Sequence, residues 1–160
     1  MDKKSTQTEL TITKKDIKFI TVNMLNMNLK EVNFSQNKII YLPDEMCELV
    51  NLEKLDLEKN NLRELPQEFG YMRKMKDLNL SNNELRSLPD SLSRCRDLEQ
   101  LSLNDNKLEI LPNNLGDCSK LKVLHIQNNK LTQIPSSLSR LVNISAITFE
   151  WFMYLDPPQQ

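Results

Sequence analysis

The sequence contains a single histidine, His125, and residues at repeat-related positions near it have the types needed for a nucleophilic site. Ser102 lies 23 residues before His125, and Asp105 follows Ser102 by three residues. In a Ser-His-Asp triad the histidine takes the serine proton and the carboxylate orients the histidine. That chemistry also requires oxyanion donors and a concave pocket that excludes water. The interpretation of these residues therefore depends on the elements that position them.

Carboxylates occur in pairs that could perform acid–base catalysis or bind a cation. Asp56 with Glu58 is one such pair, and Asp77 with Glu99 is another. The lysines interleaved with these acids are Lys54, Lys59 and Lys76. Mixed signs of this kind are typical of a solvated, salt-bridging surface. We therefore predict neither a catalytic carboxylate pair nor a metal site.

Cysteines and glycines offer little for disulfide or cofactor chemistry. The cysteines Cys47, Cys95 and Cys118 are odd in number and have no closely spaced pair, which argues against a disulfide framework and a zinc site. We expect reduced thiols. The only two glycines, Gly70 and Gly116, are too far apart to form a phosphate-binding loop, and we interpret them as local turn residues. No cofactor is predicted.

The composition narrows the class of protein and of partner. With 160 residues, 39% of them apolar and 27% charged, the chain is expected to form one globular unit. The formal net charge is −1 and basic residues are mixed with acids, so we expect neither nucleic acid nor a membrane surface as partner. The first nine residues are polar and show no secretory signal, so we expect an intracellular, cytoplasmic location.

A period of 23 residues organises most of the chain. The apolar positions Leu52, Leu55, Leu57, Leu62 and Leu65 recur 23 residues later as Met75, Leu78, Leu80, Leu85 and Leu88. Asn60 and Pro66 recur with the same spacing. Cys95 and Cys118 occupy one apolar position of successive units, so we interpret them as core residues. Five full units therefore run over residues 29–143.

Each unit has the pattern of a strand followed by a compact return. In Leu55-Asp56-Leu57 the apolar residues alternate with a polar one, as in a strand that buries one face. The asparagine amide can satisfy backbone groups where the chain turns, and proline ends the strand. A single unit cannot bury its apolar face, whereas stacked units can. The units therefore predict a solenoid with parallel strands about 4.8 Å apart.

The repeated pattern LxxLxLxxNxLxxLPxxLxxLxx resembles the leucine-rich-repeat family over roughly residues 10–150. The Leu-Pro step and the 23-residue period are most similar to the intracellular subclass found in Ras-suppressor-like scaffolds and Roco kinases. The resemblance implies an α/β leucine-rich-repeat solenoid. In that fold a curved parallel sheet forms the concave side, and short helical or 3-10 segments form the convex side.

The two ends depart from the repeat and predict the domain organisation. Residues 1–9 are expected to form a disordered polar tail, and residues 10–28 a degenerate capping repeat that lacks the proline. Residues 144–155 form a half-repeat with an aromatic stretch, which we interpret as a hydrophobic cap or, alternatively, as a docking surface for a following domain. Residues 156–160 would be a Pro-rich tail.

The exposed positions of the strands carry the functional prediction. An open sheet of parallel strands provides neither oxyanion donors nor a closed pocket, so we predict a non-enzymatic interaction module that binds a partner protein through its concave face. Outward positions vary between units while inward positions do not. The predicted contact residues are Asp56, Glu58, Asn79, Ser102, Asp105, Val123, His125, Gln127, Thr148 and Trp151. We expect the C-terminal half, around Val123, His125 and Trp151, to contribute most.

The partner class follows from the resemblance alone. It suggests small GTPases or signalling kinases as partners of a chain that is a monomer on its own, with no small-molecule substrate. Two alternatives stay open. The chain could be a structural component of a cytoskeletal or axonemal assembly, or the regulatory repeat domain of a longer signalling enzyme.

Overall fold

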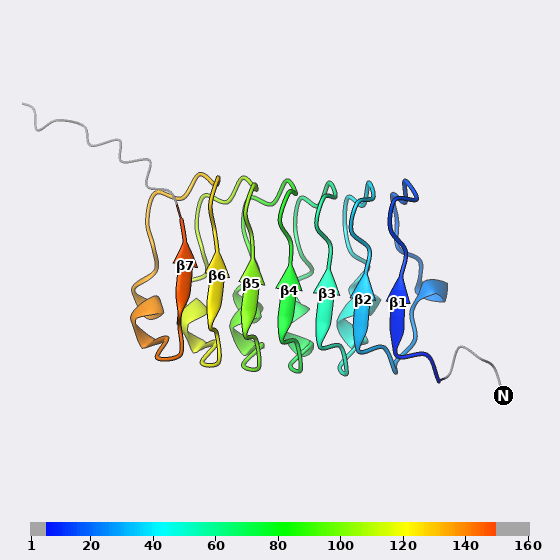
Figure 1. Cartoon of the computed structure of the whole chain (residues 1–160), viewed down its shortest axis with the longest axis horizontal. Helices are drawn as coiled ribbons and strands as arrows, with labels where there is room; N and C mark the ends of the chain where they lie inside the picture. Colours follow the sequence, from blue (N-terminus) through cyan, green and yellow to red (C-terminus); the bar gives the residue numbers. More distant parts are fainter. Residues whose placement is uncertain (1–5, 150–160) are drawn as a thin grey trace, which may run out of the picture.

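The structure, a computed structural model, describes residues 6–149 and consists of one parallel sheet backed by short 3-10 helices (Figure 1). The strands are β1 (Glu9–Thr11), β2 (Glu31–Asn33), β3 (Lys54–Asp56), β4 (Asp77–Asn79), β5 (Gln100–Ser102), β6 (Val123–His125) and β7 (Ala146–Thr148). The 3-10 helices are η2 (Val22–Met24), η3 (Asp44–Glu48), η4 (Phe69–Tyr71), η5 (Asp90–Arg94), η6 (Leu115–Asp117) and η7 (Ser136–Arg140). Strand order in the sheet follows the sequence from β1 to β7. The predicted α/β leucine-rich-repeat solenoid is confirmed.

The strand register follows the repeat period. Leu55 of β3 pairs with Leu78 of β4, and Leu78 pairs with Leu101 of β5. All three side chains are buried, because the middle residue of each strand points into the core. The residues on either side of it point out of the sheet, so equivalent positions of successive units form columns across the strand face. The register thus reproduces the columns that the repeat predicts.

A ladder of asparagines joins neighbouring units inside the turn that follows each strand. Asn83 is typical: its Nδ2 donates to the carbonyl of Leu80 in its own unit (3.0 Å) and to that of Leu57 in the preceding unit (2.9 Å). Its Oδ1 accepts from the backbone N–H of Leu62 (2.9 Å). The members of the ladder are Asn37, Asn60, Asn83, Asn106 and Asn129. These bonds satisfy backbone groups that would otherwise be buried without partners.

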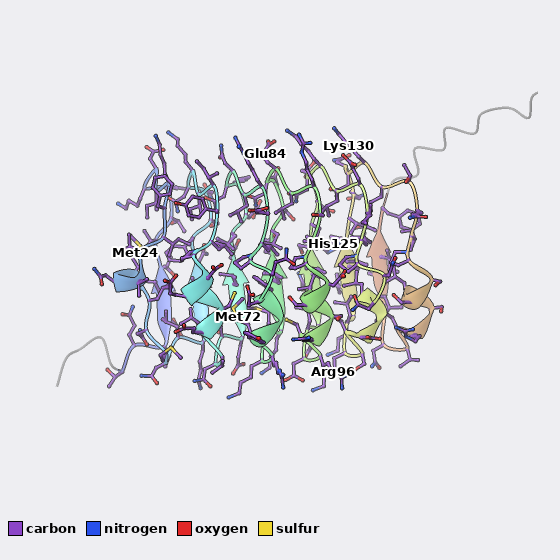
Figure 2. All side chains as sticks on the ribbon, turned by 180° about the vertical axis from the view of Figure 1, so that it is seen from behind. Met24, Met72, Glu84, Arg96, His125 and Lys130 are labelled. Atoms are coloured by element: carbon purple, nitrogen blue, oxygen red, sulfur yellow. The ribbon has the colours of Figure 1, made fainter. Side chains whose placement is uncertain are left out.

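The return path on the convex side consists of 3-10 turns rather than α-helices. Proline fixes φ at the residue before η3, η5 and η7, where Pro43, Pro89 and Pro135 adopt an extended backbone. Short turns with i to i+3 hydrogen bonds allow the chain to form the convex side of each unit with few residues. Figure 2 views this side and shows the helices in front of the sheet, with Arg96 near one edge of the solenoid and Glu84 and Lys130 near the other.

The two glycines are explained by close packing between units and not by a turn conformation, which corrects our interpretation from the sequence. Neither glycine has a positive φ. A Cβ on Gly70 would lie 2.0 Å from the backbone oxygen of Ser91, and one on Gly116 would lie 1.9 Å from that of Ser137. The backbone N–H groups of Gly70 and Gly116 also donate to the Oγ atoms of these serines. Only a residue without Cβ allows this approach.

The ends of the array differ from its middle. β1 begins at Glu9, which pairs with Glu31, so the first strand includes the last residue of the predicted polar tail. In place of a ladder asparagine the first unit has Lys15, whose backbone N–H donates to Asn37 Oδ1 (3.0 Å). At the other end Ile147 of β7 is only partly buried, because no further described strand stacks against it. The predicted aromatic cap (151–155) and Pro-rich tail (156–160) lie outside the described residues.

Candidate interaction surface

The strand face brings most of the predicted contact residues into neighbouring columns. Asp56, Asn79, Ser102, His125 and Thr148 form one column over β3 to β7, each paired in register with the next. Val123 lies in the column of first strand residues, and Glu58, Asp105 and Gln127 follow the strands. Trp151 lies outside the described residues. The described members therefore form one continuous face, with solvent on one side and the core on the other.

Ser102 contributes little surface to that face. Its exposed fraction is only 7%, whereas Asp56, Asn79 and His125 are half-buried. The small serine side chain lies among larger neighbours in the column, so a partner would meet those neighbours first. Ser102 therefore belongs to the support of the face rather than to its contact surface.

His125 makes its hydrogen bond toward the C-terminal end of the array. Its Nδ1 lies 2.7 Å from Oγ1 of Thr148 on β7. Ser102 Oγ is not among the hydrogen-bond partners of the ring in the described part of the chain. Asp105 instead accepts from Nδ2 of Asn128 (2.8 Å), and its backbone is left-handed, with φ of 56°. His125 and Asp105 are therefore bonded to residues outside the possible triad.

A hollow of about 330 Å³ lies over β1 to β5. Its polar rim includes Glu31, Lys54, Asp56, Asp77 and Asn79. Lys54 bonds to Glu31 across the two strands at 3.0 Å, which leaves the carboxylates of Glu9, Asp56 and Asp77 as the lining acids outside that ion pair. This hollow lies in the N-terminal half of the face, whereas we expect from the sequence that the C-terminal half contributes most to contact with a partner.

Asp56 and Asp77 are carboxylates in an environment that resists their ionisation. Burial raises the pKa of Asp56, and nearby Glu58 and Asp77 add to this, while the bond from the backbone N–H of Glu58 (2.9 Å) opposes it. Burial also raises the pKa of Asp77, against the attraction of Lys54. A cationic group from a partner would restore favourable interactions to these charges. Charge at the hollow therefore favours a partner with basic side chains.

Replacement of Asp56 with asparagine is expected to stabilise the fold at pH 7 and to leave its stability unchanged near pH 3. A carboxyl whose pKa is raised by folding favours the folded state below its unfolded pKa and loses that contribution as pH rises through its folded pKa. Asparagine removes the charge but can still accept the N–H bond, as Asn79 does from Ser81 (3.2 Å). Urea unfolding at the two pH values measures the difference.

The control for this substitution is Glu109→Gln, which removes a negative charge from an exposed side chain. It should shift the urea midpoint by far less than Asp56→Asn does at pH 7. A lower midpoint for Asp56→Asn than for the wild type at pH 7 would contradict the desolvation argument.

Cys95 and Cys118 are core residues, as their repeat position predicts. They and Cys47 are free and buried. Burial raises the pKa of Cys95 to about 12, and it raises that of Cys118 to about 12 with a further contribution from Asp117. Thiols with such pKa values are protonated at neutral pH and react slowly. Residues 6–149 also contain no group of three His, Cys, Asp or Glu side chains placed to hold a metal ion.

Among residues 6–149, no helix combines the length and the hydropathy that crossing a membrane requires. The helices of the structure are 3-10 segments of three to five residues.

Comparison with known proteins agrees with the fold. Two sequence models of the leucine-rich-repeat family match residues 50–108 and 120–141, together about half of the chain. A leucine-rich-repeat protein of Leptospira interrogans is similar in structure, with a TM-score of 0.77 and 27% identity over 86% of this chain and 41% of that one. No curated protein sequence matches.

A second similar structure is the leucine-rich-repeat ectodomain of the membrane receptor kinase GASSHO1/SCHENGEN3 from Arabidopsis thaliana, in complex with Casparian strip integrity factor 2. The TM-score is 0.68 and the identity 30%, over 77% of this chain and 16% of that one. The chain thus spans less than half the length of either structure. With its family matches, its stacked parallel strands and its asparagine ladder, the chain belongs to the leucine-rich-repeat family.

Proposed function

We propose that this chain binds a partner protein through the concave strand face and has no catalytic role. Leucine-rich-repeat domains are generally non-enzymatic interaction modules. The observation that carries the proposal is the continuous column of strand-face side chains over β2 to β7, whose members differ between neighbouring units while the buried middle positions stay apolar. A face of this kind presents one side chain from each strand to a bound partner.

Two regions of the face support contact with a partner. The hollow over β1 to β5 offers shape and the carboxylates of Asp56 and Asp77. The C-terminal strands offer Val123 and His125, an apolar and an aromatic side chain that are both partly exposed on the face. We propose that one extended partner contacts both regions, with the C-terminal strands contributing most of the binding energy.

The partner class and the cellular location are also proposals. By analogy with the intracellular Leu-Pro subclass, we infer a small GTPase or a signalling kinase as the partner. The Leu-Pro or Ile-Pro step in all five full units and the three free, buried cysteines support an intracellular location.

The double substitution Val123→Glu with His125→Glu is expected to reduce the recovery of co-purifying partners by about tenfold or more, because it places two carboxylates in the middle of the proposed contact. The single substitution Asp56→Lys should weaken recovery less. The measurement is quantitative affinity purification of the tagged full chain from its own cells, with wild type and variants compared side by side.

Arg96→Glu is the matched control, because it changes the charge by the same amount on an exposed residue near one edge of the solenoid, outside the strand face (Figure 2). It should leave the partners unchanged. Loss of partners with Asp56→Lys alone would move the main contact to the hollow. Loss with Arg96→Glu, and retention with both strand-face variants, would contradict a concave binding face.

A further inference from the structure

Large apolar side chains are exposed mainly in the first three units. Six of the nine described large apolar residues that are exposed lie before residue 72, namely Phe19, Val22, Met27, Tyr41, Val50 and Tyr71. The other three are Ile110, Val142 and Phe149, which lie apart from one another in the sequence. An apolar surface gathered in one region marks a contact site more often than scattered apolar residues do. Residues 10–74 therefore expose more large apolar side chains than the rest of the described chain, and Phe19 and Tyr41 among them pack against each other with ring centroids 5.5 Å apart.

Part of this surface forms a groove along η3 and η4. The groove has a volume of about 670 Å³, and its apolar lining comes from Met27, Val50 and Tyr71. These side chains are 51%, 46% and 50% exposed, so each presents about half of its surface to solvent. Cys47, which is buried, lies beneath them. The groove is large enough to take several side chains of a bound segment.

The groove is bordered by carboxylates that have no cationic partner. Its acidic lining residues are Asp44, Glu45, Glu48 and Glu68, and no lysine or arginine lines it. None of the four takes part in an ion pair within the described part of the chain. Burial, together with the charges of Asp44 and Glu68, raises the pKa of the Cys47 thiol to about 11. The carboxylates therefore impose a negative potential on the groove.

Several carboxylates elsewhere in the solenoid are matched to lysines of the next unit. Lys76 Nζ lies 2.6 Å from Glu53, and Lys122 Nζ lies 2.6 Å from Glu99. No lysine or arginine lines the groove itself, although the chain as a whole is nearly neutral, and Arg94 shares the adjoining hollow with Glu68 and Tyr71. The local excess of negative charge is thus a property of this surface and not of the composition.

We propose that the groove docks an amphipathic segment of a partner protein, in which one apolar face is flanked by lysine or arginine. The apolar side chains enter between Met27, Val50 and Tyr71, and the cations pair with the carboxylates at the border. The aromatic stretch of this chain, residues 151–155, contains no basic residue and does not match that charge. An anionic membrane surface would be repelled by it. This site is on the opposite side from the concave face and does not depend on the proposed function.

The test uses a fluorescent synthetic peptide of about 15 residues in which leucine and lysine form an amphipathic helix. Two comparison peptides replace lysine with glutamate or leucine with serine. Fluorescence anisotropy with the full chain should show binding of the leucine–lysine peptide and affinities lower by about tenfold or more for both others. Equal binding of the serine–lysine peptide would overturn the proposal, because it would show attraction by charge alone.

Variants locate the binding on the groove. Val50→Ser with Tyr71→Ser, and separately Glu45→Lys with Glu48→Lys, should each weaken binding of the leucine–lysine peptide by about tenfold. Val142→Ser is the matched control, since Val142 occupies the repeat position of Val50 and is 86% exposed. Asp56→Lys tests whether the peptide binds instead at the hollow on the concave face. Unchanged binding by both groove variants, or loss with Asp56→Lys alone, would overturn the proposal, and circular dichroism confirms that each variant is folded.

Discussion

Replacement of Asn60 with alanine is expected to lower the free energy of unfolding by about 2–4 kcal/mol. Asn60 is 7% exposed, and its Oδ1 accepts from the backbone N–H of Ile39 at 3.0 Å. Alanine leaves that buried N–H without an acceptor. The Nδ2 group of Asn60 also donates to the carbonyls of Phe34 and Leu57, both at 3.0 Å. Urea unfolding followed by circular dichroism measures the loss.

The carbonyl groups explain why the expected loss is not larger. Phe34 also receives a bond from Asn37, and Leu57 receives one from Asn83, so each carbonyl keeps a donor when Asn60 is removed. The N–H of Ile39 has no such second partner, and its desolvation dominates the cost. Each of these backbone carbonyls therefore accepts from asparagines of two units, whereas the backbone N–H of Ile39 has the Asn60 side chain as its single acceptor.

Asn61 provides the control for Asn60. It is the next residue in the chain, its side chain is exposed, and its backbone N–H still bonds to the carbonyl of Ile39 (2.8 Å) in an alanine variant. Asn61→Ala should change stability by less than about 0.5 kcal/mol. Equal losses for the two variants would show that the ladder bonds contribute little beyond the local backbone.

The strand face could be predicted from sequence because the repeat fixes it. One 23-residue offset sets which residue pairs with which, so the column from Asp56 to His125 follows from counting alone. The alternation of apolar and polar residues sets which side of the sheet each residue faces. The ladder was predictable for the same reason, since the asparagine recurs at one position where backbone groups turn inward.

Features that depend on distances between units were not predictable in this way. The close contact of Gly70 with Ser91 depends on how tightly η4 packs on η5, which the repeat pattern does not specify. The low exposure of Ser102 depends on the size of its neighbours. The groove lined by Val50 and Tyr71 is formed by side chains of different units, and the sequence of a single unit does not predict it. The repeat period predicts which residues of successive units are neighbours, whereas side-chain packing determines the distances between them.

Replacement of Gly116 with alanine is expected to destabilise the solenoid by about 3 kcal/mol or more and to separate the unfolding of its C-terminal part from the rest. The new Cβ would lie 1.9 Å from the backbone oxygen of Ser137 and 2.4 Å from its carbonyl carbon. A backbone atom cannot rotate away as a side chain can, so η7 must move off η6. In a solenoid each unit is stabilised by its neighbours, so the damage stays at that one interface.

Hydrogen exchange measures where the damage lies. In Gly116→Ala, protection should fall in residues 121–149 and persist in the units before residue 98, whereas Gly70→Ala should weaken the array near its middle and lower protection on both sides.

Ser139→Ala is the control, because Ser139 occupies the same repeat position in the last full unit, is exposed and already carries a Cβ. It should shift stability by less than about 0.5 kcal/mol. A uniform loss of protection along the whole chain in Gly116→Ala would show that the units unfold as one cooperative body, and that the contact between η6 and η7 is not where the solenoid divides.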